Sequence, residues 1–175
     1  MTAVPIYTIG HSTRTLDEFL GLLHAHQLEQ LADVRTVPKS RRHPHFVGQA
    51  LAASLPVAGI AYRHFPGLGG LRKPRRDSPN AAWQNASFRG YADHMATAEF
   101  QAAIDALVEW SVRRTVIMCA ESLWWRCHRQ LIADALVARG IEVRHISSAT
   151  SAPRHVLTEF ARVDASGRVT YPGLL

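Results

Sequence analysis

The chain has 175 residues, 47% of them hydrophobic, and a formal net charge of +6 at pH 7. This length suits one well-filled core, and the composition is ordinary for a globular protein. No apolar run approaches the ~18 to 20 residues needed to cross a membrane, the first residues do not form a secretory signal, and two cysteines make no disulfide framework. We therefore expect a cytoplasmic protein.

The basic residues are concentrated in one part of the chain. The sequence from Val34 to Arg76 contains no Asp or Glu. Its nine basic residues are Arg35, Lys39, Arg41, Arg42, Arg63, Arg72, Lys73, Arg75 and Arg76. This bias favours an anionic partner, either a phosphate-bearing small molecule or nucleic acid. The alternative is a basic surface that only faces solvent.

The first predicted strand and helix enclose a candidate anion site. Val4 to Ile9 is rich in β-forming residues, and Thr15 with Glu18 has the form of a capping box that begins a helix. The loop between them, Gly10 to Arg14, brings together a small residue, a hydroxyl group and helix N–H groups, which is a suitable cradle for an anion. The alternative is that Gly10 only supplies the turn and Ser12 only assists the cap.

Two further strands are predicted before residue 65. Residues 28–34 form a strand that ends in Asp33-Val34-Arg35, and residues 59–64 form another after a short helix over 49–55. Between the two strands, residues 38–44 are too polar and too rich in proline to be regular. This loop contains Arg41 and Arg42 and suits contacts with phosphate or nucleic acid, although a merely solvated loop is an equal alternative.

A glycine-rich segment over residues 66–72 precedes an irregular one. Gly69 and Gly70 permit the chain to approach a ligand closely, but no Gly-Lys-Ser/Thr follows, so this is not a P-loop. We expect residues 73–86 to form a flexible or lid-like insertion. Trp83, Phe88 and Tyr91 lie among basic residues, a combination that stacks bases or sugars. An equal alternative is that these rings anchor the loop to the core.

The second half of the chain continues the alternation of helices and strands. Thr97 is a plausible N-cap for a helix that leads into a buried strand at residues 115–118. Another helix begins near Cys127, and residues 143–146 form the last strand of the core. For the tail, the sequence predicts a short helix from Pro153 to Arg162.

Reactive side chains gather between the strand at 115–118 and the helix after Cys127. Ligands of α/β sheets bind where strands end and helices begin. Cys127 lies beside a helix start and several basic residues, so it should have a lowered pKa and could act as a nucleophile. Cys119 and Cys127 could instead be small buried hydrophobes. Because adjacent helical residues point about 100° apart, we do not expect Cys127 and His128 to face one spot.

Glu121 is the candidate acid or base of this stretch. Together with Asp33 and His11 from other strand ends, it could supply acid–base catalysis. Its carboxylate would repel a bound oxyanion, which argues against phosphatase or sulfurtransferase activity. A metal site from His11, Cys119, Cys127 and His128 is an alternative, but these residues show no recognised metal-ligand spacing, so we predict no metal and no other cofactor.

Several short motifs occur together in the order found in a known family. They are Thr8-Ile-Gly-His-Ser12 with Arg14, Asp33-Val-Arg35 with Pro38 and Ser40, Leu68-Gly-Gly70 with Arg72, Phe88-Arg-Gly-Tyr91, Met118-Cys-Ala-Glu121, and Cys127-His-Arg129 with Ile132-Ala133. The chain thereby resembles the bacterial family called domain of unknown function 488. The resemblance extends from the first strand to Ile146. It implies a compact α/β fold and no established reaction.

These observations combine into one prediction of fold and organisation. We expect a single α/β domain over residues 1–175, with a mostly parallel open sheet and helices on both faces (Rossmann-like). Its core covers about residues 4–146, a basic loop or lid about 66–91, and a tail 147–175. The ends of the strands should lie along one edge of the sheet.

The leading functional hypothesis is an enzyme that acts on a phosphate-bearing substrate, either a nucleotide or nucleic acid. The alternative is a non-catalytic nucleic-acid-binding or adaptor module. The candidate catalytic residues are Glu121, Cys119, Cys127, Asp33 and His11. The candidate substrate-binding residues are Gly10, Ser12, Arg14, Arg35, Arg41, Arg42, Gly69, Gly70, Arg72, Tyr91, His128 and Arg129. We expect a single pocket, partly covered by residues 66–91, to unite Gly10, His11, Arg14, Asp33, Arg35, Cys119, Glu121 and Arg129.

Overall fold

Five parallel strands form the central sheet of this computed structural model, which describes residues 4–173. The strands are β1 (Ile6–Gly10), β2 (Gln30–Asp33), β3 (Ala61–His64), β4 (Thr115–Cys119) and β5 (Val143–His145). They lie in the order β3-β2-β4-β1-β5, and every neighbouring pair is parallel. The predicted Rossmann-like α/β fold is confirmed, and the carboxyl ends of the strands share one edge of the sheet.

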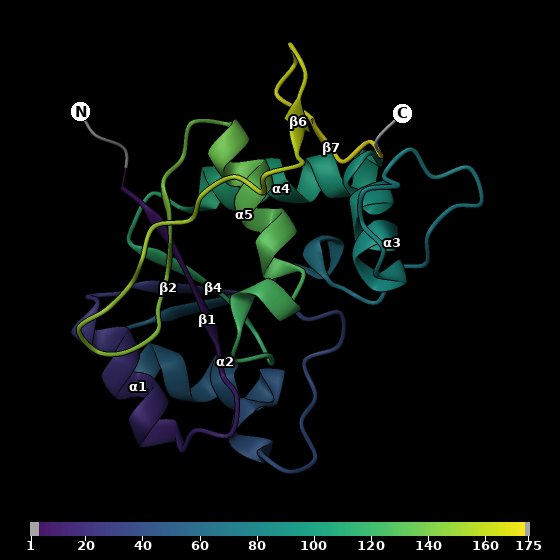
Figure 1. Ribbon diagram of the computed structural model, residues 1–175. Coiled ribbons are helices and arrows are strands. Elements are labelled where there is room, and N and C mark those ends of the chain that lie inside the picture. Colours follow the sequence, from purple (N-terminus) through teal and green to yellow (C-terminus); the bar gives the residue numbers. More distant parts are fainter. Residues whose placement is uncertain (1–3, 174–175) are drawn as a thin grey trace.

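Helices cover both faces of this sheet. They are α1 (Leu16–Ala25), α2 (Gly48–Val57), α3 (Ala86–Met95), α4 (Ala98–Trp110) and α5 (Arg129–Ala138), and short 3-10 turns cover Pro44–Phe46, Pro66–Leu68 and Trp124–Arg126. Figure 1 shows α1 and α2 on one face and α3, α4 and α5 on the other. No helix within residues 4–173 combines the length and the apolar character that a membrane crossing requires.

The central strands contribute to a hydrophobic core on each side. Val116 of β4 packs in the layer of α1 and α2, whereas the next residue, Ile117, packs in the layer of α4 and α5. This alternation follows from the two-residue period of a strand. All five residues of β4 are buried, which explains why the strand appears in the sequence as a continuous apolar run.

Helix starts and turns follow local sequence signals. Thr15 and Glu18 form the predicted capping box at the start of α1, with both reciprocal hydrogen bonds present. Thr97 caps α4 through its side chain, as predicted. Gly59 and Gly140 follow α2 and α5 with φ angles of 82° and 81°, a left-handed conformation that ends a helix and leads into the next strand.

The C-terminal tail departs from the sequence prediction. The helix predicted from Pro153 to Arg162 is wrong, because this segment contains no helix. Its backbone bonds instead to β5, through His145 N to the Pro153 carbonyl (2.9 Å) and His155 N to the Val143 carbonyl (2.7 Å). Covering the free edge of an outer strand satisfies backbone groups that a local helix would leave exposed. A small hairpin, β6 (Arg162–Val163) with β7 (Val169–Thr170), completes the tail.

Candidate active site

A cavity of about 400 Å³ opens at the carboxyl end of the sheet. It lies where β2 and β4 end and α5 begins, with the glycine-rich segment and α3 on the opposite side. Its lining consists of Arg35, Thr36, Val37, Lys39, Gly70, Leu71, Ser87, Phe88, Tyr91, Cys119, Ala120, Glu121, Arg126, Cys127 and His128. A volume of this size is within the usual range for small-molecule sites, roughly 300 to 1,000 Å³.

The two cysteines of the chain meet in this cavity. Cys119 is the last residue of β4, and Cys127 lies just before His128, the N-cap of α5. Their Sγ atoms are 2.8 Å apart, and both residues are almost fully buried. The two thiols are thus hydrogen-bonded to each other, and either sulfur can be the donor.

His128 faces Cys127 in the orientation of a general base. Its Nε2 lies 2.7 Å from the Val34 carbonyl, which can only accept, so Nε2 carries the proton. In the neutral ring Nδ1 is then free to accept, and it lies 3.4 Å from Cys127 Sγ. The prediction that Cys127 and His128 would not face one spot is wrong, because Cys127 precedes the helix with φ −133° and ψ 154°.

Arg129 places a buried positive charge beneath the thiol pair. The residue is 1% exposed, and its Nε donates to Cys119 Sγ at 3.0 Å while its backbone N–H donates to Cys127 Sγ at 3.4 Å. Its remaining donors bond to Thr8 and to the carbonyls of residues 121 and 122. Within residues 4–173 no carboxylate forms an ion pair with Arg129. A buried cation needs an anion nearby, and a thiolate of this pair is the group in position to supply it.

The pKa values of the two thiols diverge. Burial raises the pKa of Cys127, but hydrogen bonds from Cys119 and His128 and the charges of His128 and Arg129 outweigh it, so this pKa lies well below its usual value. Burial, followed by the hydrogen bond to Cys127, raises the pKa of Cys119 well above its usual value. These directions favour Cys127 over Cys119 as the thiol that ionises first.

A second polar cluster lies beside the cavity at the end of β2. Arg35 donates to both carboxylate oxygens of Asp33, at 2.9 and 2.7 Å, and to the Phe46 carbonyl at 2.7 Å. Tyr62 adds a 2.6 Å hydrogen bond to Asp33, and Arg35 Nη1 lies 3.4 Å from His11 Nε2. Burial lowers the pKa of His11 to about 4, so the ring is neutral at pH 7. Asp33 and His11 thus surround Arg35 and do not line the cavity.

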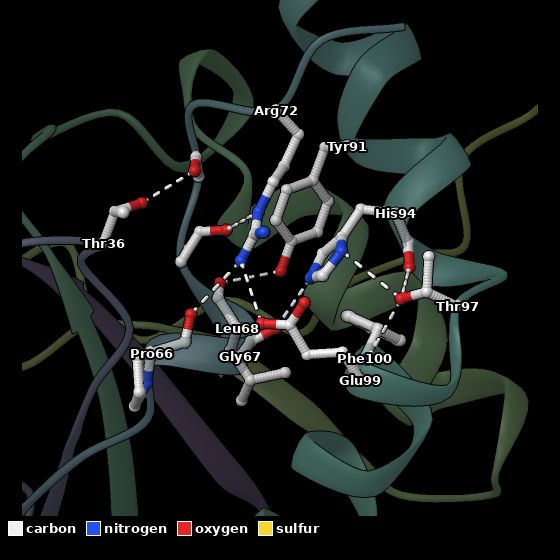
Figure 2. Close-up of polar contacts among 12 residues, drawn as sticks. Thr36, Pro66, Gly67, Leu68, Arg72, Tyr91, His94, Thr97, Glu99 and Phe100 are labelled. Carbon is white, nitrogen blue, oxygen red and sulfur yellow. Dashed lines mark hydrogen bonds and ion pairs between the residues drawn. The ribbon is translucent and has the colours of Figure 1, made fainter. Parts of the chain in front are cut away.

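The glycine-rich segment forms a tethered wall of the cavity. Figure 2 shows polar side chains directed at its carbonyl groups: Tyr91 Oη at that of Leu68 (2.8 Å) and His94 Nε2 at that of Gly67 (2.7 Å). Arg72 bonds to two further carbonyls of the same segment and lies outside the cavity lining. These contacts fix the backbone of residues 66–72.

Gly69 and Gly70 allow this wall to lie close to Thr36 and His128. A Cβ atom on Gly69 would lie 2.6 Å from Thr36 Cα, and one on Gly70 would lie 3.1 Å from His128 Nδ1. Of the three aromatic residues nearby, Phe88 and Tyr91 line the cavity. Trp83 instead packs among Phe88 and other rings of the interior, so it anchors the segment.

The loop after β1 has its polar groups already engaged. The N–H groups of His11 and Ser12 donate to the carbonyls of Cys119 and Ala120, and the Arg14 guanidinium donates to the Gly10 carbonyl. A Cβ on Gly10 would lie 1.7 Å from the Glu121 carbonyl oxygen, so glycine is needed for this close crossing. None of these residues from Gly10 to Arg14 lines the cavity, and neither do the exposed Arg41 and Arg42.

The single pocket predicted from the sequence is therefore only partly correct. Arg35, Cys119 and Glu121 line the cavity, but the other five members of that set do not. Glu121 is exposed at the cavity, with one carboxylate oxygen accepting from Leu123 N–H at 3.2 Å. Within residues 4–173 no group of three or more His, Cys, Asp or Glu side chains is arranged to hold a metal ion.

A buried chain of hydrogen bonds continues from Arg129 into the interior. Arg129 Nη1 donates to Thr8 Oγ1 (3.1 Å), which leaves the Thr8 hydroxyl to donate to His145 Nδ1 (2.6 Å). His145 Nε2 then donates to His155 Nδ1 (2.9 Å), and His155 Nε2 to the Asp134 carboxylate (2.8 Å). With this choice of tautomers the chain runs in one direction, from the guanidinium of Arg129 to the carboxylate of Asp134. Sequence reasoning missed it, because the residues come from separate elements.

Comparisons with known proteins add a family assignment. Residues 15–136 match the family described as Domain of unknown function DUF488. This range includes the end of β2, the glycine-rich wall, both cysteines and the start of α5. No curated protein and no solved structure matches the chain.

Proposed function

The chain belongs to the DUF488 family, whose description states no reaction, and we propose from the site itself that this protein is a cysteine-dependent enzyme acting on a phosphate-bearing small molecule. The observation that carries the proposal is the Cys127 sulfur, which lies in a cavity between His128 and a buried Arg129 that has no carboxylate partner among residues 4–173. A thiolate held in this way at neutral pH is a nucleophile.

The proposed first step is transfer of the Cys127 proton to His128. The Val34 carbonyl holds Nε2–H of His128, so the free Nδ1 receives this proton and the pair becomes thiolate and imidazolium. The thiolate attacks an electrophilic centre of the substrate, so that a bond to sulfur forms and the bond to the leaving group breaks. His128 then returns the proton to the leaving group, as the base of a nucleophilic pair does. Glu121, exposed at the same cavity, is the candidate for activating the water that releases the product.

The lining of the cavity favours an anionic substrate that also carries a ring. Lys39 and Arg126 are exposed side chains of the lining, and neither forms an ion pair within residues 4–173. We assign them to the phosphate group. Phe88, half-buried on the opposite wall, offers aromatic surface to a base. A nucleotide has both parts, with the phosphate serving as a handle and the reacting atom lying near Cys127.

One observation favours a second candidate, a nucleic-acid-binding module. Arg41 and Arg42 are exposed next to Lys39, outside the cavity, and they extend its positive charge along the surface. A long polyanion would use this surface in addition to the cavity. In that case the cavity would bind a single nucleotide unit without changing it.

The proposal is tested by combining ligand binding with protection of Cys127. Nucleoside mono- and diphosphates are screened for a rise in melting temperature, with a single-stranded oligonucleotide as the competing probe. A nucleotide that binds the cavity should also slow alkylation of Cys127 by iodoacetamide, which mass spectrometry follows. Stabilisation without protection would place the ligand elsewhere, and stabilisation by the oligonucleotide alone would favour the binding module.

Turnover of a stabilising nucleotide then separates the residue roles. Cys127→Ser should abolish turnover and keep binding, because serine preserves the shape but ionises far less readily. Glu121→Gln should keep binding or tighten it, since it removes a negative charge from the site, and should abolish turnover if Glu121 transfers a proton. Glu159→Gln, a change of another exposed glutamate in the tail, is the matched control. Normal turnover by Glu121→Gln would remove Glu121 from the mechanism.

A further inference from the structure

The pairing of the two cysteines gives this site a chemistry beyond nucleophilic attack on a substrate. The Sγ atoms are 2.8 Å apart, about 0.8 Å beyond the ~2.05 Å of a disulfide bond. Both residues line the cavity, so a small oxidant can reach them from solvent. Oxidation of this pair requires only the thiolate of Cys127 and is independent of the nature of the substrate.

We propose that Cys127 is a site of oxidation by hydroperoxides, with Cys119 as the resolving thiol that converts the product into a reversible disulfide within the chain. The proposal shares the Cys127 thiolate with the proposed function and extends it to a second reactant class. Because the disulfide consumes the nucleophile, its formation would also switch the proposed reaction off.

The first step is attack of the Cys127 thiolate on one oxygen of the hydroperoxide. A sulfur–oxygen bond forms, the oxygen–oxygen bond breaks, and the sulfur is oxidised by two electrons to sulfenic acid. The alkoxide or hydroxide that leaves takes the proton that Cys127 had given to His128. His128 Nδ1, 3.4 Å from the sulfur, is in position to deliver it.

The second step is attack of Cys119 on the sulfenic sulfur. The sulfur–sulfur bond forms, the sulfur–oxygen bond breaks, and the departing hydroxide combines with the proton lost by Cys119 to form water. In sum, two thiols and one hydroperoxide give one disulfide, one alcohol or water, and one water. A dithiol reductant reverses the reaction by thiol–disulfide exchange.

The position of Arg129 favours oxidation of Cys127 first and ionisation of Cys119 second. Its Nε donates to Cys119 Sγ at 3.0 Å, so the guanidinium contacts the resolving sulfur directly. While Cys127 is a thiolate, its charge helps to raise the pKa of Cys119, after the larger contribution of burial. Oxidation of Cys127 to neutral sulfenic acid removes that negative charge. The charge of Arg129 is then available to stabilise the thiolate of Cys119, at the moment when that thiolate is required.

The sequence offers a direct readout of the bond. Cleavage after Arg114, Arg126 and Arg129 with trypsin leaves Cys119 in the peptide 115–126 and Cys127 in the peptide 127–129. The reduced full-length protein is treated with one equivalent of hydrogen peroxide, alkylated under denaturing conditions and digested. We expect the two peptides to appear as one linked species, lighter than their sum by two hydrogen atoms, and to separate again after dithiothreitol treatment.

Two variants assign the roles of the cysteines. Cys119→Ser should stop at the sulfenic acid, which dimedone traps on Cys127. Cys127→Ser should leave Cys119 as a free thiol under the same conditions. Dimedone labelling of Cys119 in the Cys127→Ser protein at the same rate would reverse the roles and overturn the assignment.

The wild-type experiment is decisive even if a variant fails to fold. Sulfinic acid on Cys127 without linked peptides, or linkage only between two chains, would overturn the proposal. This failure is distinguishable from failure of the proposed function. Fast alkylation of Cys127 that a nucleotide blocks can persist without the disulfide, and the disulfide can form in a protein that turns over no nucleotide.

Discussion

Two arginines are buried at the carboxyl edge of the sheet, and they differ in what neutralises them. Arg35 is 6% exposed and pairs with the Asp33 carboxylate, whereas Arg129 is 1% exposed and contacts two sulfur atoms and backbone carbonyls. A carboxylate keeps its charge throughout the physiological pH range, so the first pair is structural. A thiolate can be protonated, can attack an electrophile or can be oxidised, so the pair of Arg129 with the thiols is reactive.

The two clusters are linked by the backbone between Asp33 and Arg35. The Val34 carbonyl accepts the hydrogen bond that orients His128. Four hydrogen bonds to Asp33, from the backbone N–H and two side-chain groups of Arg35 and from Tyr62, hold this turn in place. The pair of Arg35 and Asp33 therefore positions His128, the proposed base for Cys127.

Breaking the structural pair should give the largest effect on stability. Asp33→Asn leaves the guanidinium of Arg35 buried without an anion, and such a loss costs about 3 to 5 kcal/mol in the free energy of unfolding. Equilibrium unfolding in urea measures it. Asp77→Asn, which breaks the exposed pair of Arg75 and Asp77, is the control and should cost less than about 1 kcal/mol. Equal losses in the two variants would mean that the Asp33 pair is not structural.

Breaking the reactive pair should change reactivity more than stability. Arg129→Met removes the buried cation, and the thiolate that remains can be neutralised by taking up a proton. The guanidinium of Arg35, left without Asp33, cannot be neutralised by losing a proton. The pKa of Cys127 should rise toward that of an ordinary thiol, which lowers its alkylation rate near neutral pH about tenfold. The rate of iodoacetamide labelling against pH, followed by mass spectrometry, measures this shift.

Arg139→Met provides the matched control for the reactive pair. Arg139 follows the last turn of α5 and pairs with Asp105 at the surface, far along the helix from the thiols. Its removal should leave the labelling profile of Cys127 unchanged. An unchanged profile in Arg129→Met as well would show that Arg129 does not stabilise the thiolate.

The sequence could predict the parts of the molecule that depend on interactions between neighbouring residues. Strands, caps and glycine turns depend on neighbours within a few residues, so the five strands and the capping box at Thr15 were predicted correctly. The tail helix was predicted wrongly, because residues 153–155 bond to a distant strand and the local pattern contains no sign of it.

The candidate site shows the same limit. The cysteines, His128 and Arg129 could be singled out because they are close in the sequence. That Val34 orients His128 from 94 positions away could not be predicted, since it depends on how β2 and α5 meet. The role of Glu121 stays a prediction. The chain through His145, His155 and Asp134 has no sequence signature, because each member is an ordinary residue until the fold brings it together with the others.

Acid should weaken both clusters through one histidine in each. His11 faces Arg35, and His145 is joined to Arg129 through Thr8. Burial is the main cause that lowers their pKa values, to about 4 and about 3. Below the unfolded value of about 6.5, the unfolded chain binds more protons than the folded one, so stability is complete above that pH and falls as the pH decreases toward the folded values.

The loss can be measured as the free energy of unfolding in urea at about pH 7 and about pH 5.5, with a slope of up to about 1.4 kcal/mol per pH unit for each histidine. His145→Gln and His11→Asn should each remove one contribution, and the two contributions should add, because the clusters have separate partners. A slope that neither substitution reduces would mean that other groups control the acid response.

The smallest predicted effect tests whether the buried chain positions Arg129. Thr8 is hydrogen-bonded to both Arg129 and His145, so Thr8→Val removes both hydrogen bonds and leaves a side chain of similar shape. One lost hydrogen bond of about 0.5 to 1.5 kcal/mol should lower the alkylation rate of Cys127 by roughly threefold near neutral pH. Thr8→Ser keeps the hydroxyl and should restore the rate, whereas a general packing defect would lower it in both variants. If Thr8→Val reduces stability but leaves the pH profile of labelling intact, the chain through His145 supports the fold and has no influence on the thiolate.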